Sequence, residues 1–153
     1  MTDILWRFAD MTPKSFAPGE KLIEEGRETG KLFVLKSGEV EVSRRGFTVA
    51  SLAEPGAVLG EMSALLDRPH TATVTAKTAV EAYGLDHGMK FLEERPALAL
   101  HVAALLAQRL ENTTDLAARL RQGAVAQKRD LTLFEKLFGF LTGQPPAKKA
   151  EGR

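Results

Sequence analysis

The stretch best equipped for chemistry runs from Gly60 to Val74, where a glycine precedes a short helical segment and a proline closes the following loop. Residues 62–66 are expected to form one helical turn. The first turn of a helix has backbone N–H groups without intrahelical partners, and these groups and the helix dipole attract a phosphate. Glu61 does not suit a phosphate, but its carboxylate can accept hydrogen bonds from sugar hydroxyls. On residue types alone, the segment is either such a ligand-binding loop or an ordinary surface turn.

The residues around this segment predict short antiparallel strands. Glycine and proline recur at short intervals between residues 13 and 60, which is typical of strands joined by turns. Apolar and polar residues alternate over 39–43 and over 71–76, and the run Leu32–Leu35 is wholly apolar, as expected of a strand buried on both faces. Further strands are expected to start at Phe47, after a turn at 44–46, and to include Val80, Ala82 and Leu85.

Helices are expected to flank these strands. Asp3 is placed to cap a short first helix, and Asp86 is placed to cap a second one. Pro96 suits the first turn of a long helix over 96–122, because residues 97–122 contain no glycine or proline. The predicted fold is therefore α+β: an antiparallel β-roll, or jelly-roll-like barrel, flanked by an N-terminal helix and a long C-terminal helix, with a short extra C-terminal helix.

The long helix carries an apolar stripe that is longer than a small roll alone can cover. A helix over 97–122 spans roughly 39 Å. Either the whole helix lies along its own roll, or part of it packs against a second copy in a homodimer, which the length of the stripe favours. The stripe consists of Leu98, Val102, Leu105, Leu106, Leu110, Leu116 and Leu120.

The chain after the long helix divides into two parts. Gly123 is expected to weaken or end the helix, and residues 124–142 form an amphipathic segment with Phe134 and Phe138 among its apolar residues. This extra helix either folds back onto the domain or docks on a partner protein or a membrane surface. Residues 143–153 are predicted to be a disordered basic tail.

Charge is unevenly distributed along a chain whose formal net charge is only +1. Residues 1–118 carry 13 basic and 17 acidic side chains, whereas residues 119–153 carry 8 basic and 3 acidic ones. The small total gives no reason to expect a nucleic-acid binder. The basic end is either a solvated tail or a contact for an anionic partner.

Several kinds of site are excluded by what the chain lacks. The absence of cysteine excludes disulfides, thiolate metal sites and a cysteine nucleophile, and it fits a reducing, cytoplasmic location. The histidines at 70, 87 and 101 are too widely spaced for a metal site, and no nucleophile elbow, Walker loop or Gly-x-Gly-x-x-Gly turn is present. No apolar run is long enough for a membrane span, and the N-terminus is not a secretory signal. We therefore expect no enzyme activity, metal or cofactor.

Together with residues upstream of it, the segment from Gly60 to Val74 resembles the phosphate-binding cassette of cyclic-nucleotide-binding domains. Such domains occur in kinase regulatory subunits, gated channels and the catabolite activator family. The resemblance covers roughly residues 3–120, and we place the domain at 3–122. The upstream residues that match the family's strands and structural glycines are Phe16–Glu20, Gly26, Leu32–Leu35 and Gly38–Val40.

The resemblance implies a role for most residues of the cassette. Gly60 corresponds to the glycine that lets the backbone approach the ligand, and Glu61 to the glutamate that binds the ribose 2′-hydroxyl. Ser63 and Ala64 correspond to residues that supply backbone donors to the cyclic phosphate. Thr71 lies beside the phosphate in this comparison, where its hydroxyl is able to add a further contact.

The resemblance extends to the long helix. Arg109 corresponds to an arginine that pairs with the cassette glutamate in the catabolite activator family. Thr113 and Thr114 correspond to hydroxyl residues that contact the adenine, one from each subunit of a dimer. The expected ligand-binding residues are thus Gly60, Glu61, Met62, Ser63, Ala64, His70, Thr71, Arg109, Thr113 and Thr114.

The sequence departs from the family at His70, where the family has an arginine that holds the phosphate. Arginine is always charged and offers a planar fork of donors, whereas histidine has an unperturbed pKa near ~6.5. Loss of a charged hydrogen bond weakens binding by about 10–100-fold. His70 is therefore a weaker, pH-sensitive phosphate contact, or it marks a pocket retuned for another anion, or the pocket has lost its ligand.

The predicted function is a stand-alone regulatory sensor that binds cAMP or cGMP and signals through its C-terminal helices. The 31 residues after Gln122 are too few for the helix-turn-helix domain of the family's transcription factors, so we do not expect direct DNA binding. The alternative is a domain of the same fold that has lost its ligand and acts as a protein-interaction domain.

Overall fold

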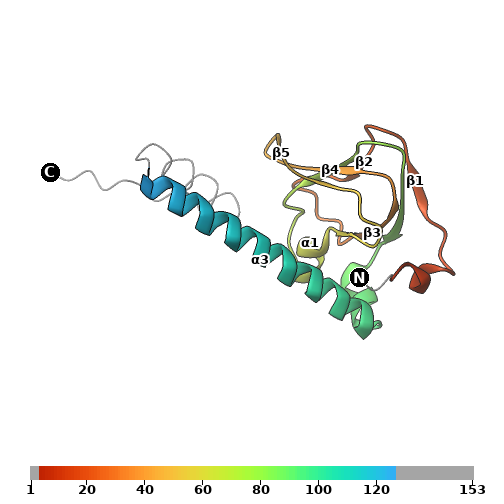
Figure 1. Cartoon of the computed structure of the whole chain (residues 1–153). Coiled ribbons are helices and arrows are strands. Elements are labelled where there is room, and N and C mark those ends of the chain that lie inside the picture. The colour runs from red at the N-terminus through yellow and green to blue at the C-terminus, as the bar shows by residue number, and fades with distance from the viewer. Residues whose placement is uncertain (1–3, 127–153) are drawn as a thin grey trace. The chain divides into compact units, whose positions relative to one another are not determined.

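The computed structural model describes residues 4–126, which belong to two compact units divided between Leu105 and Leu106. All of the described strands belong to the first unit, and the described part of the second unit is a single helical segment (Figure 1). The strands are β1 (Lys14–Phe16), β2 (Lys21–Ile23), β3 (Leu32–Ser37), β4 (Val40–Arg44), β5 (Phe47–Leu52), β6 (Val58–Leu59), β7 (Thr73–Ala76) and β8 (Val80–Leu85). The helices are the 3-10 helix η1 (Leu5–Phe8) and the α-helices α1 (Glu61–Leu66), α2 (Gly88–Glu93) and α3 (Pro96–Ala126).

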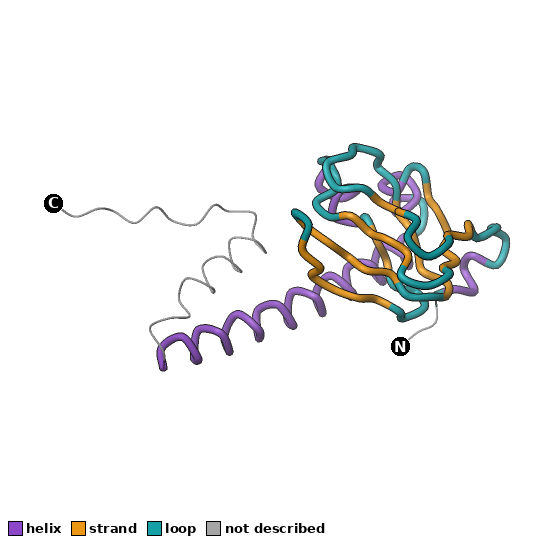
Figure 2. Tube along the Cα trace, turned by 90° about the horizontal axis from the view of Figure 1, so that it is seen from above, coloured by secondary structure: helices purple, strands orange, loops and turns teal. Residues whose placement is uncertain are grey.

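The strands form two four-stranded antiparallel sheets, with the orders β1-β8-β3-β6 and β2-β7-β4-β5. Figure 2 shows the strands of the first unit lying together, with loops and short helices around them. The predicted antiparallel β-roll is confirmed, but the sheets do not close into a barrel. Among the described residues, each sheet keeps two edge strands, and β1, β2 and β6 have only two or three residues each, which is too short to close the roll.

The core of the roll is apolar and draws on both sheets. Leu32–Leu35 of β3 is buried throughout, which confirms the prediction from its wholly apolar sequence. Phe8 of η1 is also buried, and its ring stacks on Tyr83 of β8 with the ring centroids 5.0 Å apart. The main cluster contains Leu22, Ile23, Phe33, Leu35, Val40, Ala57, Leu59, Val74, Ala76, Val80 and Ala82.

The two short flanking helices begin differently from the prediction. η1 follows Ile4 at its N-cap, and Asp3 lies outside the described residues. α2 follows His87, without a side-chain capping bond, so Asp86 is not the cap. The Asp86 carboxylate instead lies 3.4 Å from the Lys31 ammonium group. A partner far along the chain therefore replaces the local cap that the sequence suggested.

α3 starts at Pro96, as predicted, because proline suits the first helical turn. Leu98 and Val102 are buried and hold the first part of the helix in the first unit. The helix continues through Gly123 to Ala126, past the predicted end at 122. A glycine costs a helix only about 1 kcal/mol, and neighbouring alanines favour continuation. Most of the predicted extra helix at 124–142, and all of the tail at 143–153, lie outside the described residues.

Candidate functional site

The cassette begins with a glycine that no other residue can replace without strain. Gly60 follows β6 and has a left-handed backbone conformation with φ of +85° as the N-cap of α1. A Cβ atom there would lie 2.6 Å from the carbonyl oxygen of Lys31 and 3.0 Å from Cδ1 of Ile23. Both the dihedral angle and the crowding therefore require glycine. This sharp turn lets α1 start directly from the buried strand β6.

Glu61 occupies the first position of α1 and is only 5 % exposed. A carboxylate in the first turn of a helix is stabilised by the positive end of the helix dipole and by nearby N–H groups. A carboxylate is rarely buried to this extent unless its surroundings satisfy it. The structure thus places a buried carboxylate at the start of the short helix that the sequence predicted.

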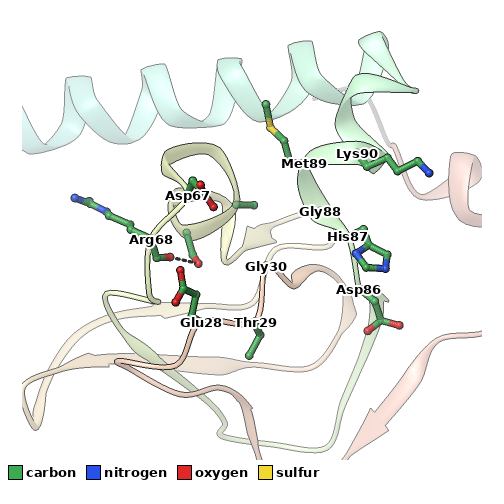
Figure 3. A pocket seen from close by; sticks show the side chains of 12 residues that line it. Glu28, Thr29, Gly30, Asp67, Arg68, Asp86, His87, Gly88, Met89 and Lys90 are labelled. Atoms are coloured by element: carbon green, nitrogen blue, oxygen red, sulfur yellow. Dashed lines mark hydrogen bonds between the residues drawn. The ribbon is translucent and has the colours of Figure 1, made fainter.

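Ser63 shapes the cassette with its side chain, a role that the sequence did not suggest. The Ser63 hydroxyl donates to the carbonyl oxygen of Arg68 at 2.5 Å, and the N–H of Arg68 donates back to the carbonyl of Ser63 at 3.3 Å (Figure 3). Asp67, between them, has a φ of +48° and also donates its N–H to the Ser63 carbonyl. These bonds close the loop after α1 onto the helix.

The other predicted residues of α1 differ in their surroundings. The Ala64 N–H donates to the Gly60 carbonyl at 3.2 Å, so it is already used within the turn. The N–H groups of Glu61 to Ser63 precede the first such bond and are the better candidates for phosphate donors. Met62 is 39 % exposed.

His70 is buried and hydrogen-bonded to the loop before β3. Its side chain is 4 % exposed, and its Nε2 atom lies 2.7 Å from the Thr29 hydroxyl oxygen, with which it shares a hydrogen bond. Its backbone N–H donates to the Arg27 carbonyl at 2.9 Å, and its carbonyl accepts from the Gly26 N–H at 2.8 Å. Burial lowers the pKa of His70 below the ordinary value for histidine, which favours a neutral ring at neutral pH.

Thr29 is the functional candidate that the sequence did not reveal. It stands 41 residues from His70 in a loop without any motif, so no local pattern connects the two residues. The His70 ring also lies against the cassette glycine, since its Cε1 atom would be 3.3 Å from a Cβ on Gly60. His70 thus joins the Thr29 loop to the start of α1. Thr71, which follows it, is half-buried, and the next strand begins at Thr73 rather than at the predicted Thr71.

A cavity of about 290 Å³ borders the same helix. It shares Ser63 and Ala64 with the predicted site but contains none of Gly60, Glu61 and His70 in its lining. Figure 3 shows acidic side chains around it from three separate loops, while the Arg68 side chain extends away. The residues that line it are Glu28, Thr29, Gly30, Ser63, Ala64, Asp67, Arg68, Asp86, His87, Gly88, Met89 and Lys90. The carboxylates in this lining make the cavity a poor match for a phosphate.

Arg109, Thr113 and Thr114 lie in the second unit, on α3, and are therefore described apart from the cassette. Arg109 and Thr113 are one helical turn apart, so they share a face of the helix. Both are half-buried, whereas Thr114 is exposed and its hydroxyl donates to the Leu110 carbonyl at 2.8 Å. The Thr114 hydroxyl is thus occupied within its own helix.

Two kinds of site have no counterpart in the described part of the chain. Residues 4–126 contain no group of three or more histidine, aspartate or glutamate side chains arranged to hold a metal ion. No helix within the same residues is long and apolar enough to cross a membrane.

Comparison with known proteins agrees with this geometry. Residues 13–92 match the family model described as the cyclic nucleotide-binding domain. A cGMP-dependent protein kinase of Caenorhabditis briggsae is 34% identical over 84 residues, which are 54% of this chain and 11% of that kinase. A CRP-like cAMP-activated global transcriptional regulator of Mycobacterium tuberculosis is 27% identical over 116 residues, which are 72% of this chain and 52% of the regulator. The chain therefore spans about half of that regulator and a small part of the kinase.

One solved structure resembles a larger share of this chain than the kinase and the regulator do. The catabolite activator protein of Thermus thermophilus superposes with a TM-score of 0.63 at 27% sequence identity. The matched region covers 78% of this chain and 59% of that protein.

Proposed function

The chain belongs to the cyclic nucleotide-binding domain family, a regulatory rather than catalytic family, and on this basis we propose that it is a sensor whose cassette, Gly60 to Val74, binds cAMP or cGMP. The observation that carries the proposal is the start of α1. There a glycine with a positive φ leads directly into a buried glutamate at a helix terminus. This arrangement offers a sugar-hydroxyl acceptor beside backbone phosphate donors.

The ligand class is supported by the relatives that the chain resembles. The similar transcriptional regulator is described as cAMP-activated and the similar kinase as cGMP-dependent. Both ligands share the ribose and the cyclic phosphate, which are the groups that Glu61 and the first-turn N–H groups would contact. Within α3, Arg109 and Thr113 share a face of the helix, and we propose them as further ligand-binding residues of the second unit.

The phosphate contact in this proposal is weaker than a cassette with an arginine would provide. Burial lowers the pKa of His70, which favours the neutral ring at neutral pH, and its Nε2 atom shares a hydrogen bond with Thr29. The ligand therefore depends on the backbone donors of Glu61 to Ser63. Because a charged hydrogen bond contributes roughly 1.5–3 kcal/mol, we expect a dissociation constant about 10–100-fold higher than with arginine.

The hydrogen bond between His70 and Thr29 favours a second candidate function. A buried His70 bonded to Thr29 stabilises the cassette loop without any ligand. In this alternative, the fold serves as a protein-interaction domain and the cassette is only structural. The two candidates differ in whether a cyclic nucleotide binds the native state.

We propose that the sensor signals through its C-terminal residues. Ligand in the cassette would shift the position of α3 and change what residues 124–142 present to a partner protein. Leu110 and Leu116 on α3 are 68 % and 49 % exposed, which supports the proposal that this helix pairs with a second copy in a homodimer. A reducing, cytoplasmic setting fits the cysteine-free sequence.

A thermal-shift titration with cAMP, cGMP and the non-cyclic 5′-monophosphates tests the proposed function. A ligand that binds only the native state raises the melting temperature, by an amount that grows with its concentration. We expect a rise with at least one cyclic nucleotide at millimolar concentration and none with the non-cyclic controls. An unchanged melting temperature with every cyclic nucleotide up to 10 mM would favour the interaction domain. A dissociation constant of 10 mM corresponds to roughly 3 kcal/mol of binding free energy.

A further inference from the structure

Thr29 and His70 share a hydrogen bond whose direction decides which ring nitrogen of His70 carries the proton. A neutral imidazole has one N–H donor and one bare nitrogen, and the bond made by one nitrogen fixes the state of the other. The Nε2 atom lies 2.7 Å from the Thr29 hydroxyl oxygen. If the hydroxyl donates to Nε2, the ring proton is on Nδ1, and if Nε2 donates, Nδ1 is bare.

The surroundings of Thr29 favour its hydroxyl as the donor. The hydroxyl oxygen already accepts a hydrogen bond from the backbone N–H of Lys31 at 3.2 Å. A hydroxyl that accepts one bond can donate its own hydrogen to a second partner, and accepting strengthens it as a donor. The length of 2.7 Å is typical of a hydroxyl donor and lies at the short limit for an N–H donor. The bonds therefore run from Lys31 through Thr29 to Nε2 of His70.

Lys31 also holds these bonds against the cassette. Its carbonyl oxygen is the atom that lies 2.6 Å from the Cβ position of Gly60, while its N–H contacts Thr29. The Cε1 atom of the His70 ring lies 3.3 Å from the same Cβ position. The backbone of His70 is bonded to the loop before β3 through both its N–H and its carbonyl, and its side chain is buried. The ring is therefore fixed beside the turn that starts α1.

Nδ1 is the ring nitrogen that is left for a ligand. It is covalently bonded to Cε1, the ring atom that lies against the Gly60 turn. Within residues 4–126, no fully buried side-chain nitrogen or oxygen lacks a hydrogen-bond partner, and Nδ1 has no partner there, so Nδ1 is not fully buried. The first N–H groups of α1, which are the proposed phosphate donors, start at the same turn. An Nδ1–H group would add one neutral donor to them.

We propose that Thr29 is a positioning residue, which keeps the proton of His70 on Nδ1 so that the neutral ring donates a hydrogen bond to the cyclic phosphate. This contact rests on the proposed function, because it belongs to the same ligand. It requires no charge on His70, and one neutral donor is weaker than the charged fork of an arginine. The loop before β3 thus contributes to phosphate binding through a residue that does not touch the ligand.

Nitrogen-15 NMR of the full chain, labelled at its histidines, tests the position of the proton without any ligand. A protonated and a bare ring nitrogen have well-separated shifts, and the His70 signals are those missing from His70→Gln. At about pH 8, where the ring is neutral, we expect a protonated Nδ1 and a bare Nε2 in the unaltered chain and in Thr29→Ser, which keeps the hydroxyl. Thr29→Val keeps the shape without the hydroxyl and should lose this preference. A protonated Nε2 in the unaltered chain, or an unchanged tautomer in Thr29→Val, would overturn the proposal.

Calorimetric titration with cAMP and with cGMP at the same pH tests the contact with the phosphate. Thr29→Val should bind about 2–10-fold more weakly than Thr29→Ser, which is the effect of one neutral hydrogen bond. A second pair does not depend on the folding of Thr29→Val. His70→Asn places an amide N–H near the position of Nδ1, and His70→Gln places one near Nε2, so His70→Asn should bind at least about threefold more tightly than His70→Gln.

The outcomes separate this contact from the proposed function. Equal affinities within either pair would overturn the phosphate contact of Nδ1, while nucleotide binding by the unaltered chain would stand. If neither nucleotide binds the unaltered chain, the proposed function fails and the phosphate contact fails with it. The NMR result then still decides whether Thr29 sets the tautomer of His70.

Discussion

The two ends of the cassette differ in how they are built. At its start, Gly60 makes a turn with positive φ, and Glu61 places a buried carboxylate in the first turn of α1. At its end, the buried His70 ring shares a hydrogen bond with the Thr29 hydroxyl, and the resemblance to the family predicts this position for its phosphate-binding arginine. In the proposed function, Glu61 at the start recognises the ribose, whereas the hydrogen bonds of His70 at the end join the cassette to the Thr29 loop. Variants at the two ends should therefore differ in how strongly they change nucleotide affinity and stability.

The largest effect is expected at Gly60. Gly60→Ala combines a φ of +85° with a Cβ only 2.6 Å from the Lys31 carbonyl oxygen, so the backbone has to move. We expect a loss of about 3 kcal/mol in the free energy of unfolding, measured by urea denaturation, and loss of nucleotide binding.

Gly46→Ala is the matched control for this variant. Gly46 has a φ of +80° but no atom within 4 Å of the Cβ position, so the change should cost only the dihedral strain, about 1 kcal/mol. If the two alanine variants lose the same stability, the crowding around Gly60 is unimportant.

Glu61→Gln tests the proposed ribose contact at the start of the cassette. The change removes the charge but keeps the shape, so the loss should appear in affinity for the cyclic nucleotide, by about 10–100-fold in calorimetry. Glu28→Gln, in the wall of the neighbouring cavity, is the control and should leave affinity within about twofold. Equal affinities for Glu61→Gln and the unaltered chain would exclude Glu61 from the ligand site.

Ser63→Ala tests the hydrogen bonds that close the loop. Its hydroxyl is the donor to the Arg68 carbonyl in a part-buried hydrogen bond, and losing that bond should cost about 1 kcal/mol of stability. Thr114→Ala removes a hydroxyl bond on an exposed helical position and should cost no more than about 0.5 kcal/mol. A Ser63→Ala chain that is as stable as Thr114→Ala would show that this bond does not hold the cassette.

The smallest effect is expected at the other end of the cassette, in the pH dependence of stability. Burial lowers the pKa of His70 in the folded state, so the unfolded chain binds the proton more readily. The stability that neutral His70 contributes is present above about pH 6.5 and is lost as the pH falls through the lower folded pKa.

His70→Gln should therefore flatten the decrease in stability between pH 7.5 and pH 5, measured by urea denaturation at each pH. His87 and His101 are present in both chains, so the difference between the two profiles belongs to residue 70. Superimposable profiles would show that His70 titrates as it does in the unfolded chain.

Features fixed by neighbouring residues were predictable from the sequence. The apolar run Leu32–Leu35 became a buried strand, and Pro96 became the first residue of α3. Gly60 followed by a short helix also appeared as predicted. In each case the local structure is decided within a few residues. The deciding features are the apolar pattern of the strand, the fixed φ of proline and the positive φ that glycine adopts.

The features that the sequence did not reveal depend on contacts between distant segments. His70 meets Thr29 across 41 residues, and Asp86 pairs with Lys31 instead of capping α2. The hydrogen bond of the Ser63 side chain could not be predicted for another reason. Its partner is a backbone carbonyl, and because every residue has one, no residue type marks the partner in the sequence. Local patterns therefore located the cassette but not the bonds that hold its ends.

Isothermal titration calorimetry of the full chain with cAMP and with cGMP, repeated on Glu61→Gln, tests the central claim most directly. We expect saturable binding of at least one of the two nucleotides, with one site per chain, and binding at least about tenfold weaker in Glu61→Gln. Absence of binding heat for both nucleotides in the unaltered chain, at several temperatures, would contradict nucleotide binding by the cassette and leave the fold as an interaction domain.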